Sequence, residues 1–168
     1  MSAVIKTVTP FVIEEVLIEA LLVVGAEPVK ITPSNLQTVS HRGGLVVGDI
    51  LTNRSDFYGP QHFRQNGDHW ILRHDSSEMN GRVSSMLTGK HYSKVGRFLE
   101  EVGSAYESTY AKHLEKLAEQ ERIRLEEERK ARVEATRQQA IAKAKSQGYS
   151  VKETTNSKGQ IQLVLTRM

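Results

Sequence analysis

The sequence predicts an α+β protein with a small antiparallel sheet, a packed N-terminal helix and one long projecting charged helix before a C-terminal β-hairpin. The segment 93–147 lacks proline, asparagine and aspartate and is rich in strong helix formers, which predicts one helix of about 80 Å at roughly 1.5 Å per residue. Alternating apolar residues around turn sequences mark β-hairpins on both sides of it. We therefore divide the chain into an α+β body at 1–92, the long helix at 93–147, charged and projecting in its middle, and a hairpin at 148–168 that completes the body.

The body begins with a strand and a helix. Residues 3–8 are expected to form a strand, and Thr9-Pro10 supplies a capping residue and a first-turn proline. The helix is expected to run from Pro10 to Val24 and to end at Gly25. Most of its side chains are apolar, so we expect it to be buried across a sheet.

Two hairpins follow in the body. The first is expected to pair 36–40 with 45–51 across a glycine-containing turn. The second pairs 57–65 with 69–74 across Asn66-Gly67, a strong short hairpin signal. These strands would form the sheet on which the N-terminal helix packs.

A third hairpin follows the long helix. Gly148 ends the helix, and the strands 149–155 and 160–167 flank the turn sequence 156–159. Apolar and polar residues alternate in the second of these strands, which indicates one buried face. We expect the N-terminal helix, the second hairpin and this strand to share one core: Leu17, Leu21, Trp70, Leu72, Ile161, Leu163 and Leu165.

The long helix changes character along its length. Apolar residues lie three or four positions apart within 95–110, which predicts one face packed on the body. Further on, large apolar residues recur every eight positions and spiral around the helix, unlike the seven-residue seam of a coiled coil. We expect the centre to be exposed and stabilised by ion pairs such as Glu126 with Lys130 and Glu128 with Arg132.

Composition limits the chemistry of the chain. It has 168 residues, a formal net charge of +3 and no cysteine, which excludes disulfides and thiolate metal sites. The N-terminal residues lack the pattern of a secretory signal, and the longest apolar run, 16–24, is too short to cross a bilayer. We therefore expect a cytoplasmic protein that binds no membrane.

Two groups of residues could bind an ion. His62, His69 and His74 could supply three zinc ligands, although the odd spacing of the last two puts them on opposite faces of a strand. Arg42-Gly43-Gly44 could form a small anion-binding nest, but we favour a simple hairpin turn there. No nucleophile elbow, Walker loop or dinucleotide-binding motif is present, so we expect neither an enzyme nor a cofactor.

These features favour a non-enzymatic adaptor or assembly subunit that binds a protein partner through the exposed centre of the long helix. The basis is a helix longer than its own domain can cover, in a chain without a catalytic set of residues. The residues expected to bind the partner are Arg122, Arg124, Leu125, Arg129, Lys130, Arg132 and Val133.

The alternative is a nucleic-acid-binding accessory protein. Its phosphate contacts would come from six cations of the same helix: Arg122, Arg124, Arg129, Lys130, Arg132 and Arg137. Interspersed glutamates at 121 and 126–128 would repel phosphate and argue against this alternative. A metal-dependent enzyme built on the three histidines is a third possibility.

Three stretches, 5–29, 63–75 and 142–168, resemble a family of uncharacterised conserved proteins that includes a plastid-encoded hypothetical reading frame of algae, cyanobacterial relatives and phage-borne copies. The matching positions are Ile5, Lys6, Thr7, Ala20, Leu21, Gly25, Asn66, Gly67, Leu72, Asp75, Gly148, Tyr149, Val151, Glu153, Gly159, Ile161, Leu163 and Arg167. Family members are sometimes encoded near AAA-type ATPases, which implies an accessory subunit of an ATPase system or of a phage assembly, located in the virion if the chain is phage-derived. They carry a shorter helix, so the charged segment here resembles an extension.

Overall fold

The computed structural model describes residues 3–76 and 95–167, and it has the α+β fold that the sequence predicts. In chain order the elements are β1 (Val4–Val8), α1 (Glu14–Val23), β2 (Val29–Lys30), β3 (Ile50–Asp56), β4 (Gly59–Asn66), β5 (His69–Asp75), α2 (Val95–Ser146), β6 (Tyr149–Thr155) and β7 (Ile161–Arg167). The chain forms two compact units, Met1–Leu114 (unit 1) and Glu115–Met168 (unit 2), and α2 contributes to both. The division therefore falls within the long helix and not at its ends.

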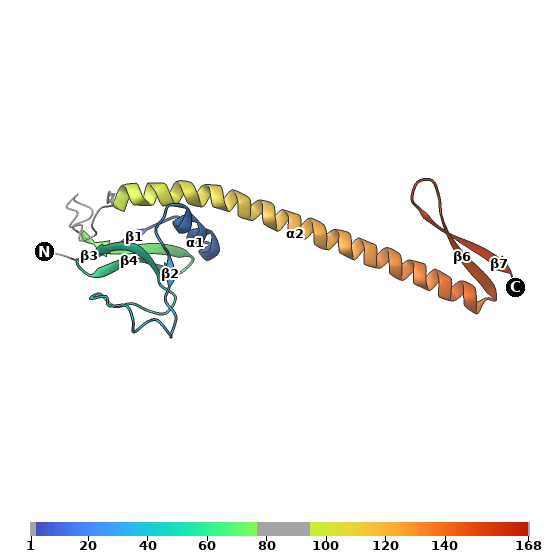
Figure 1. The fold of residues 1–168 in the computed structure, drawn as a ribbon, viewed down its shortest axis with the longest axis horizontal. Helices are drawn as coiled ribbons and strands as arrows, with labels where there is room; N and C mark the ends of the chain where they lie inside the picture. Colours follow the sequence, from blue (N-terminus) through green and yellow to red (C-terminus); the bar gives the residue numbers. More distant parts are fainter. Residues whose placement is uncertain (1–2, 77–94, 168) are drawn as a thin grey trace. The chain divides into compact units, whose positions relative to one another are not determined.

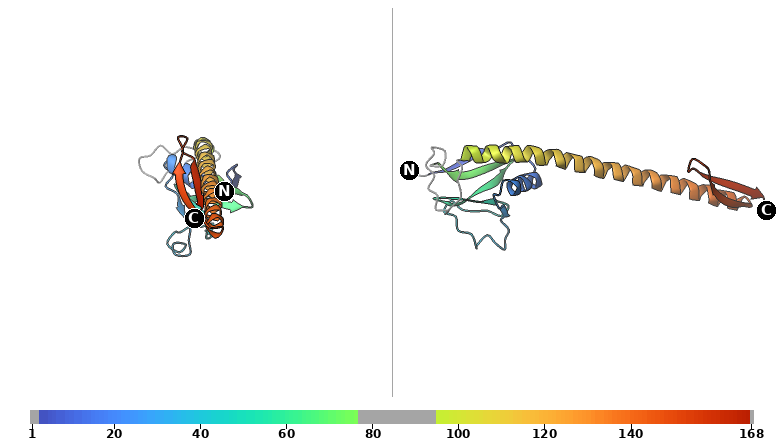
Figure 2. Two further views of the ribbon diagram at one scale, coloured as in Figure 1. Left: turned by 90° about the vertical axis from the view of Figure 1, so that its right-hand side faces the viewer. Right: turned by 45° about the horizontal axis from the view of Figure 1, so that its top comes forward.

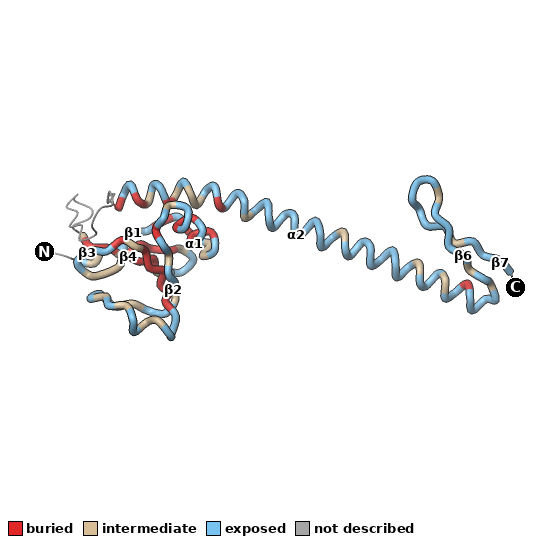
Figure 3. Tube along the Cα trace, viewed as in Figure 1, coloured by how far each residue is buried: buried red, intermediate tan, exposed pale blue. Residues whose placement is uncertain are grey.

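Unit 1 contains a five-stranded antiparallel sheet in the order β1-β5-β4-β3-β2. The register places Ile50 opposite Phe63 and Phe63 opposite Leu72, so these side chains share one face of the sheet. Helix α1 and the first turns of α2 cover that face (Figure 1). The core consists of Phe11, Leu17, Ala20, Leu21, Ala26, Ile50, Phe63, Trp70, Leu72, Val95, Phe98 and Val102. Figure 3 shows that buried residues gather on the sheet strands and on these helical turns.

Helix α1 begins at Glu14, four residues later than the sequence predicts. The preceding residues stay extended because Phe11 enters the core and its carbonyl accepts a hydrogen bond from the Trp70 amide at 2.9 Å. The hydroxyl of Tyr106, on α2, accepts hydrogen bonds from the amides of Val12 and Ile13 at 3.2 and 3.0 Å. A residue distant in sequence thus sets where α1 starts.

Of the two hairpins predicted in unit 1, the second is present and the first is not. Strands β4 and β5 pair with Asn66 opposite His69, so the loop is Gly67-Asp68, one residue beyond the predicted turn. Only the first loop residue, Gly67 (φ +66°), has a positive φ, as a type II′ turn requires. In place of the first hairpin, β2 pairs with β3, and residues 31–49 form a long connection.

The connection 31–49 crosses the face of the sheet opposite the helices. Its turn at 33–38 replaces a predicted strand because the Asn35 side chain accepts the Thr32 amide hydrogen bond at 2.7 Å and so stabilises a local turn. Further along, the amide of Arg42 donates to the carbonyl of Tyr58 at 2.7 Å. A short helical turn expected near 83–87 lies outside the described residues.

In unit 2, the predicted C-terminal hairpin is present: β6 and β7 pair along their whole length. Within the described chain these two strands form their own two-stranded sheet, so the expected pairing with the N-terminal sheet is not formed. Ile161 and Leu165 are about half exposed and Leu163 is only partly buried, whereas the other four residues of the predicted core do lie in the core of unit 1. The hairpin instead lies beside the last turns of α2, which are adjacent in sequence (Figure 2). Ile161 and Leu163 line a cavity together with residues of α2.

Candidate functional site

The candidate site lies within unit 2, between α2 and the hairpin β6–β7. The strand register places Val151 opposite Leu165, Glu153 opposite Leu163 and Thr155 opposite Ile161, so all these side chains share one face. That face is directed to α2, because Glu153 accepts hydrogen bonds from the Arg137 guanidinium, one of them at 3.2 Å. The chain reverses direction at Gly148, whose φ of +81° allows the turn that ends the helix.

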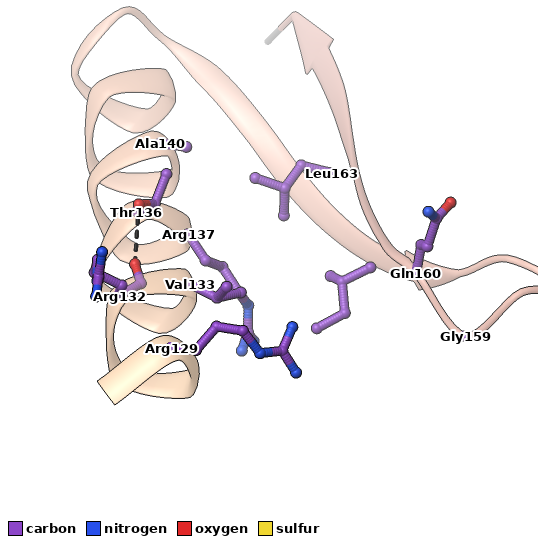
Figure 4. Close-up of a pocket in the computed structure, with 10 residues that line it drawn as sticks. Arg129, Arg132, Val133, Thr136, Arg137, Ala140, Gly159, Gln160 and Leu163 are labelled. Atoms are coloured by element: carbon purple, nitrogen blue, oxygen red, sulfur yellow. Dashed lines mark hydrogen bonds between the residues drawn. The ribbon is translucent and has the colours of Figure 1, made fainter. Parts of the chain in front are cut away.

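Helix and hairpin enclose a groove. Small side chains at Thr136, Ala140 and Ala144 lie on the helical face next to the hairpin, and Ala144 is buried there. Nearer the tip of the hairpin the helix carries bulkier residues, and a cavity of about 710 Å³ opens between the two elements (Figure 4). Its lining is Arg129, Arg132, Val133, Thr136, Arg137, Ala140, Gly159, Gln160, Ile161 and Leu163.

The floor of the groove is apolar and largely uncovered. Val133 is 56% exposed and Ile161 is 52% exposed. Among the described residues of unit 2, only one hydrophobic side chain, that of Ala144, is buried. Full burial of a single large apolar side chain is favourable by about 1.5–3 kcal/mol. A partner that covered this surface would therefore bind with a favourable contribution from these side chains.

The arginines of the groove differ in their partners. Arg137 pairs with Glu134 at 2.7 Å and with Glu153 across the groove, and these carboxylates raise the pKa of Arg137. Arg129 and Arg132 have no ion pair with a carboxylate within the part of the chain that the structure describes. The groove therefore presents, beside its apolar floor, two arginines that form no ion pair with a described carboxylate.

Of the residues predicted to bind a partner, the structure brings three together in the groove: Arg129, Arg132 and Val133. The others line the exposed helix outside it. Arg122 pairs with Glu119 at 2.7 Å and Arg124 with Glu121 at 2.5 Å.

The predicted pair of Glu126 and Lys130 is formed at 3.0 Å, whereas Glu128 and Arg132 do not pair. Leu125 is exposed and is not part of the groove. The groove also contains residues that sequence reasoning did not assign to a site: Thr136, Ala140, Gly159, Gln160, Ile161 and Leu163. The alternation of β7 and the small residues of α2 at four-residue spacing were the available signals.

The three histidines considered as zinc ligands lie apart. His62 is opposite Arg73, so the next residue, His74, points to the other face of the sheet, where its Nε2 bonds the Thr7 hydroxyl at 2.7 Å. His69 is partly exposed and pairs with Asp68 at 2.5 Å. Within residues 3–76 and 95–167, no three His, Asp or Glu side chains form a metal-binding group.

The segment Arg42-Gly43-Gly44 uses its amides internally. Beside the Arg42 amide, which bonds Tyr58, the Gly43 amide donates to Nδ1 of His41 at 3.0 Å and the Gly44 amide to the carbonyl of His41 at 3.1 Å. None of the three remains to bind an anion, and the segment lies in the long connection instead of a hairpin turn.

A buried charged cluster holds that connection to the sheet. Asp49 accepts two hydrogen bonds from Arg64, at 2.7 and 2.8 Å, and its Oδ2 lies 3.6 Å from Nε2 of His62. His62 is fully buried, donates from Nδ1 to the carbonyl of Pro60 at 3.2 Å, and leaves Nε2 without a hydrogen-bond partner. Burial lowers the pKa of His62 to about 4, an effect that His41 and Arg64 reinforce and Asp49 opposes.

The stability of unit 1 is therefore expected to fall as the pH falls from about 6.5 to about 4. In this pH range the unfolded chain binds a proton at His62 that the native protein does not. The free energy of unfolding therefore falls by roughly 1.4 kcal/mol for each pH unit crossed. The measurement is chemical denaturation at several pH values, and His62→Gln should reduce the slope. The matched change His69→Gln, at a partly exposed histidine, should leave it unaltered; an equal loss of slope in both variants would contradict this assignment.

Comparisons of the chain with protein-family models, with curated proteins and with solved structures find no match. Within the described residues, no helix combines the length and apolar character needed to cross a bilayer. The assignment of function therefore depends on the geometry of the groove, and the family resemblance stays a prediction.

Proposed function

We propose that this protein is a non-enzymatic adaptor or assembly subunit that binds a protein partner through the groove between α2 and the hairpin β6–β7. The observation that carries the proposal is a cavity of about 710 Å³ in whose lining Val133 and Ile161 are about half exposed. A two-stranded sheet packed on one helix buries little apolar surface. The stability of unit 2 alone therefore does not explain why apolar side chains line this cavity. A partner that fills the groove would bury them.

The binding surface proposed here is narrower than the whole helix centre. Arg122, Arg124 and Lys130 are engaged by glutamates of the same helix, at 2.5 to 3.0 Å. Exposed pairs of this kind stabilise a helix slightly and leave little net charge for a partner. A protein ligand is therefore expected to contact the groove residues Arg129, Arg132 and Val133. The family resemblance suggests an ATPase system or a phage assembly as the setting of such a partner.

The test is site-specific photo-crosslinking in the native host. A photoreactive residue at Val133, in the groove, should give a discrete protein adduct, because this side chain is exposed beside the apolar floor. The matched control is Lys116, an exposed position of the same helix outside the groove, which should give none. Adducts at Lys116 but not at Val133 would overturn the proposal.

The alternative of nucleic-acid binding is separated by salt dependence. Four of its six cations, Arg122, Arg124, Lys130 and Arg137, are paired with glutamates, which weakens the case for phosphate contacts. A protein that neutralises several phosphates loses affinity steeply as salt rises. Binding of single- or double-stranded nucleic acid that falls steeply with salt would favour this alternative over the adaptor.

A further inference from the structure

We propose that the occupant of the groove is an extended protein segment rich in acidic and apolar residues. This inference rests on the proposed function and specifies the chemistry of the partner at the same site. Three features of unit 2 carry it: two arginines and one strand edge that have no partner among the described residues, and an apolar floor beside them.

The charge of the groove selects for an acidic ligand. Its lining contains three arginines and no carboxylate, and of these only Arg137 pairs with described carboxylates, those of Glu134 and Glu153. Arg129 and Arg132 lie three residues apart on one face of α2, so one ligand segment can reach both. Guanidinium groups bind carboxylates through paired, charge-assisted hydrogen bonds, which favours aspartate or glutamate side chains over other polar groups.

The floor of the groove selects for apolar side chains between the acidic ones. Val133 and Ala140 from the helix face Ile161 and Leu163 from β7, as Figure 4 shows for the labelled residues. Desolvation by an apolar ligand would also strengthen the ion pairs at the rim, because the attraction between charges rises when water is excluded. A purely acidic segment would leave this floor exposed.

The hairpin supplies the reason for an extended ligand. Within the described chain, β7 pairs with β6 alone, so its other edge has unpaired backbone groups. Between Ile161 and Thr166 this strand has no charged residue and no proline, the features with which edge strands usually prevent further pairing. A third strand added at β7 would place alternate side chains toward α2, the arrangement known as β-strand addition.

The inference is tested by selecting random displayed peptides on the full-length protein. We expect the enriched peptides to combine Asp or Glu with Leu, Ile, Val or Phe. The double variant Arg129→Gln/Arg132→Gln should bind them about ten-fold more weakly or worse, the effect of losing charge-assisted hydrogen bonds. The matched control Arg124→Gln, which removes an arginine paired with Glu121 outside the groove, should bind them like the parent protein.

The outcomes separate this inference from the proposed function. Enrichment of neutral apolar peptides, lost in Val133→Asp but kept in the double arginine variant, would overturn the acidic ligand and leave the adaptor intact. Peptides that bind Val133→Asp as well as the parent protein would overturn the groove as the binding site, and with it both proposals. A dimer in sedimentation that the double variant dissociates would identify a second copy of the chain as the occupant and overturn the inference.

Discussion

Phe63→Ala is expected to lower the free energy of unfolding of unit 1 by about 3–5 kcal/mol. Phe63 is fully buried between the sheet and the helices, and its ring lies 6.1 Å from that of Phe11 in an edge-to-face contact. Truncation leaves a cavity that the surrounding strands and helices can fill only in part. The measurement is denaturant unfolding followed by the fluorescence of Trp70, which is the only tryptophan and lies in the same core.

The matched change is Leu163→Ala in β7. It should shift the Trp70 transition by less than about 0.5 kcal/mol, as for a substitution away from the core that is being monitored. The basis is that Leu163 is partly buried against α2 within unit 2 and is absent from the core of unit 1. An effect of Leu163→Ala as large as that of Phe63→Ala would show that the hairpin shares the N-terminal core, as the sequence alone predicts.

Elements with strong local signals could be predicted from the sequence. The helix α2 was found within two residues of its predicted ends because no proline, asparagine or aspartate interrupts 93–147. The hairpins β4–β5 and β6–β7 follow from alternation beside glycine-containing turns. In each case neighbouring residues contain the whole of the necessary information.

Elements that depend on distant contacts could not be predicted. The hydroxyl of Tyr106 accepts the amides that precede α1, and no pattern near Pro10 reveals that contact. The segment 36–40 has the composition of a strand, yet the side chain of Asn35 stabilises a turn at 33–38 that overlaps it, and the chain continues as a long connection. Here a competing side-chain hydrogen bond outweighs weak strand propensity.

The candidate site was predicted only in part for a similar reason. The sequence indicates a charged helix centre, but not which of its faces the hairpin approaches. Large apolar residues spiral around α2, whereas the face that packs on the hairpin is marked by the small residues Thr136, Ala140 and Ala144. Ion pairing also divides the cations: Arg122 and Arg124 pair with glutamates, whereas Arg129 and Arg132 pair with no carboxylate of the described residues.

Removal of Gln120 to Arg137 is expected to abolish partner binding while unit 1 still folds. The 18 deleted residues make five turns of α2, so the helix shortens by about 27 Å and the faces on either side keep their phase. The last residue that α2 contributes to the buried core is Val102. The thermal transition reported by Trp70 should therefore move by only a few degrees.

The groove, in contrast, loses in this deletion the residues that are proposed to bind the partner. In the spliced helix Glu119 takes the position of Arg137 and faces Glu153, so a repulsion replaces the ion pair that links helix and hairpin. Leu114 takes the position of Arg132 and Ala111 that of Arg129, which removes both unpaired charges. Binding of the selected peptides should be lost. In a pull-down, binding of the protein that was identified by crosslinking at Val133 of the full chain should be lost as well. A deletion that no longer folds would show that the centre of α2 stabilises unit 1. One that folds and still binds would place the interaction surface outside residues 120–137 and overturn the groove as the binding site.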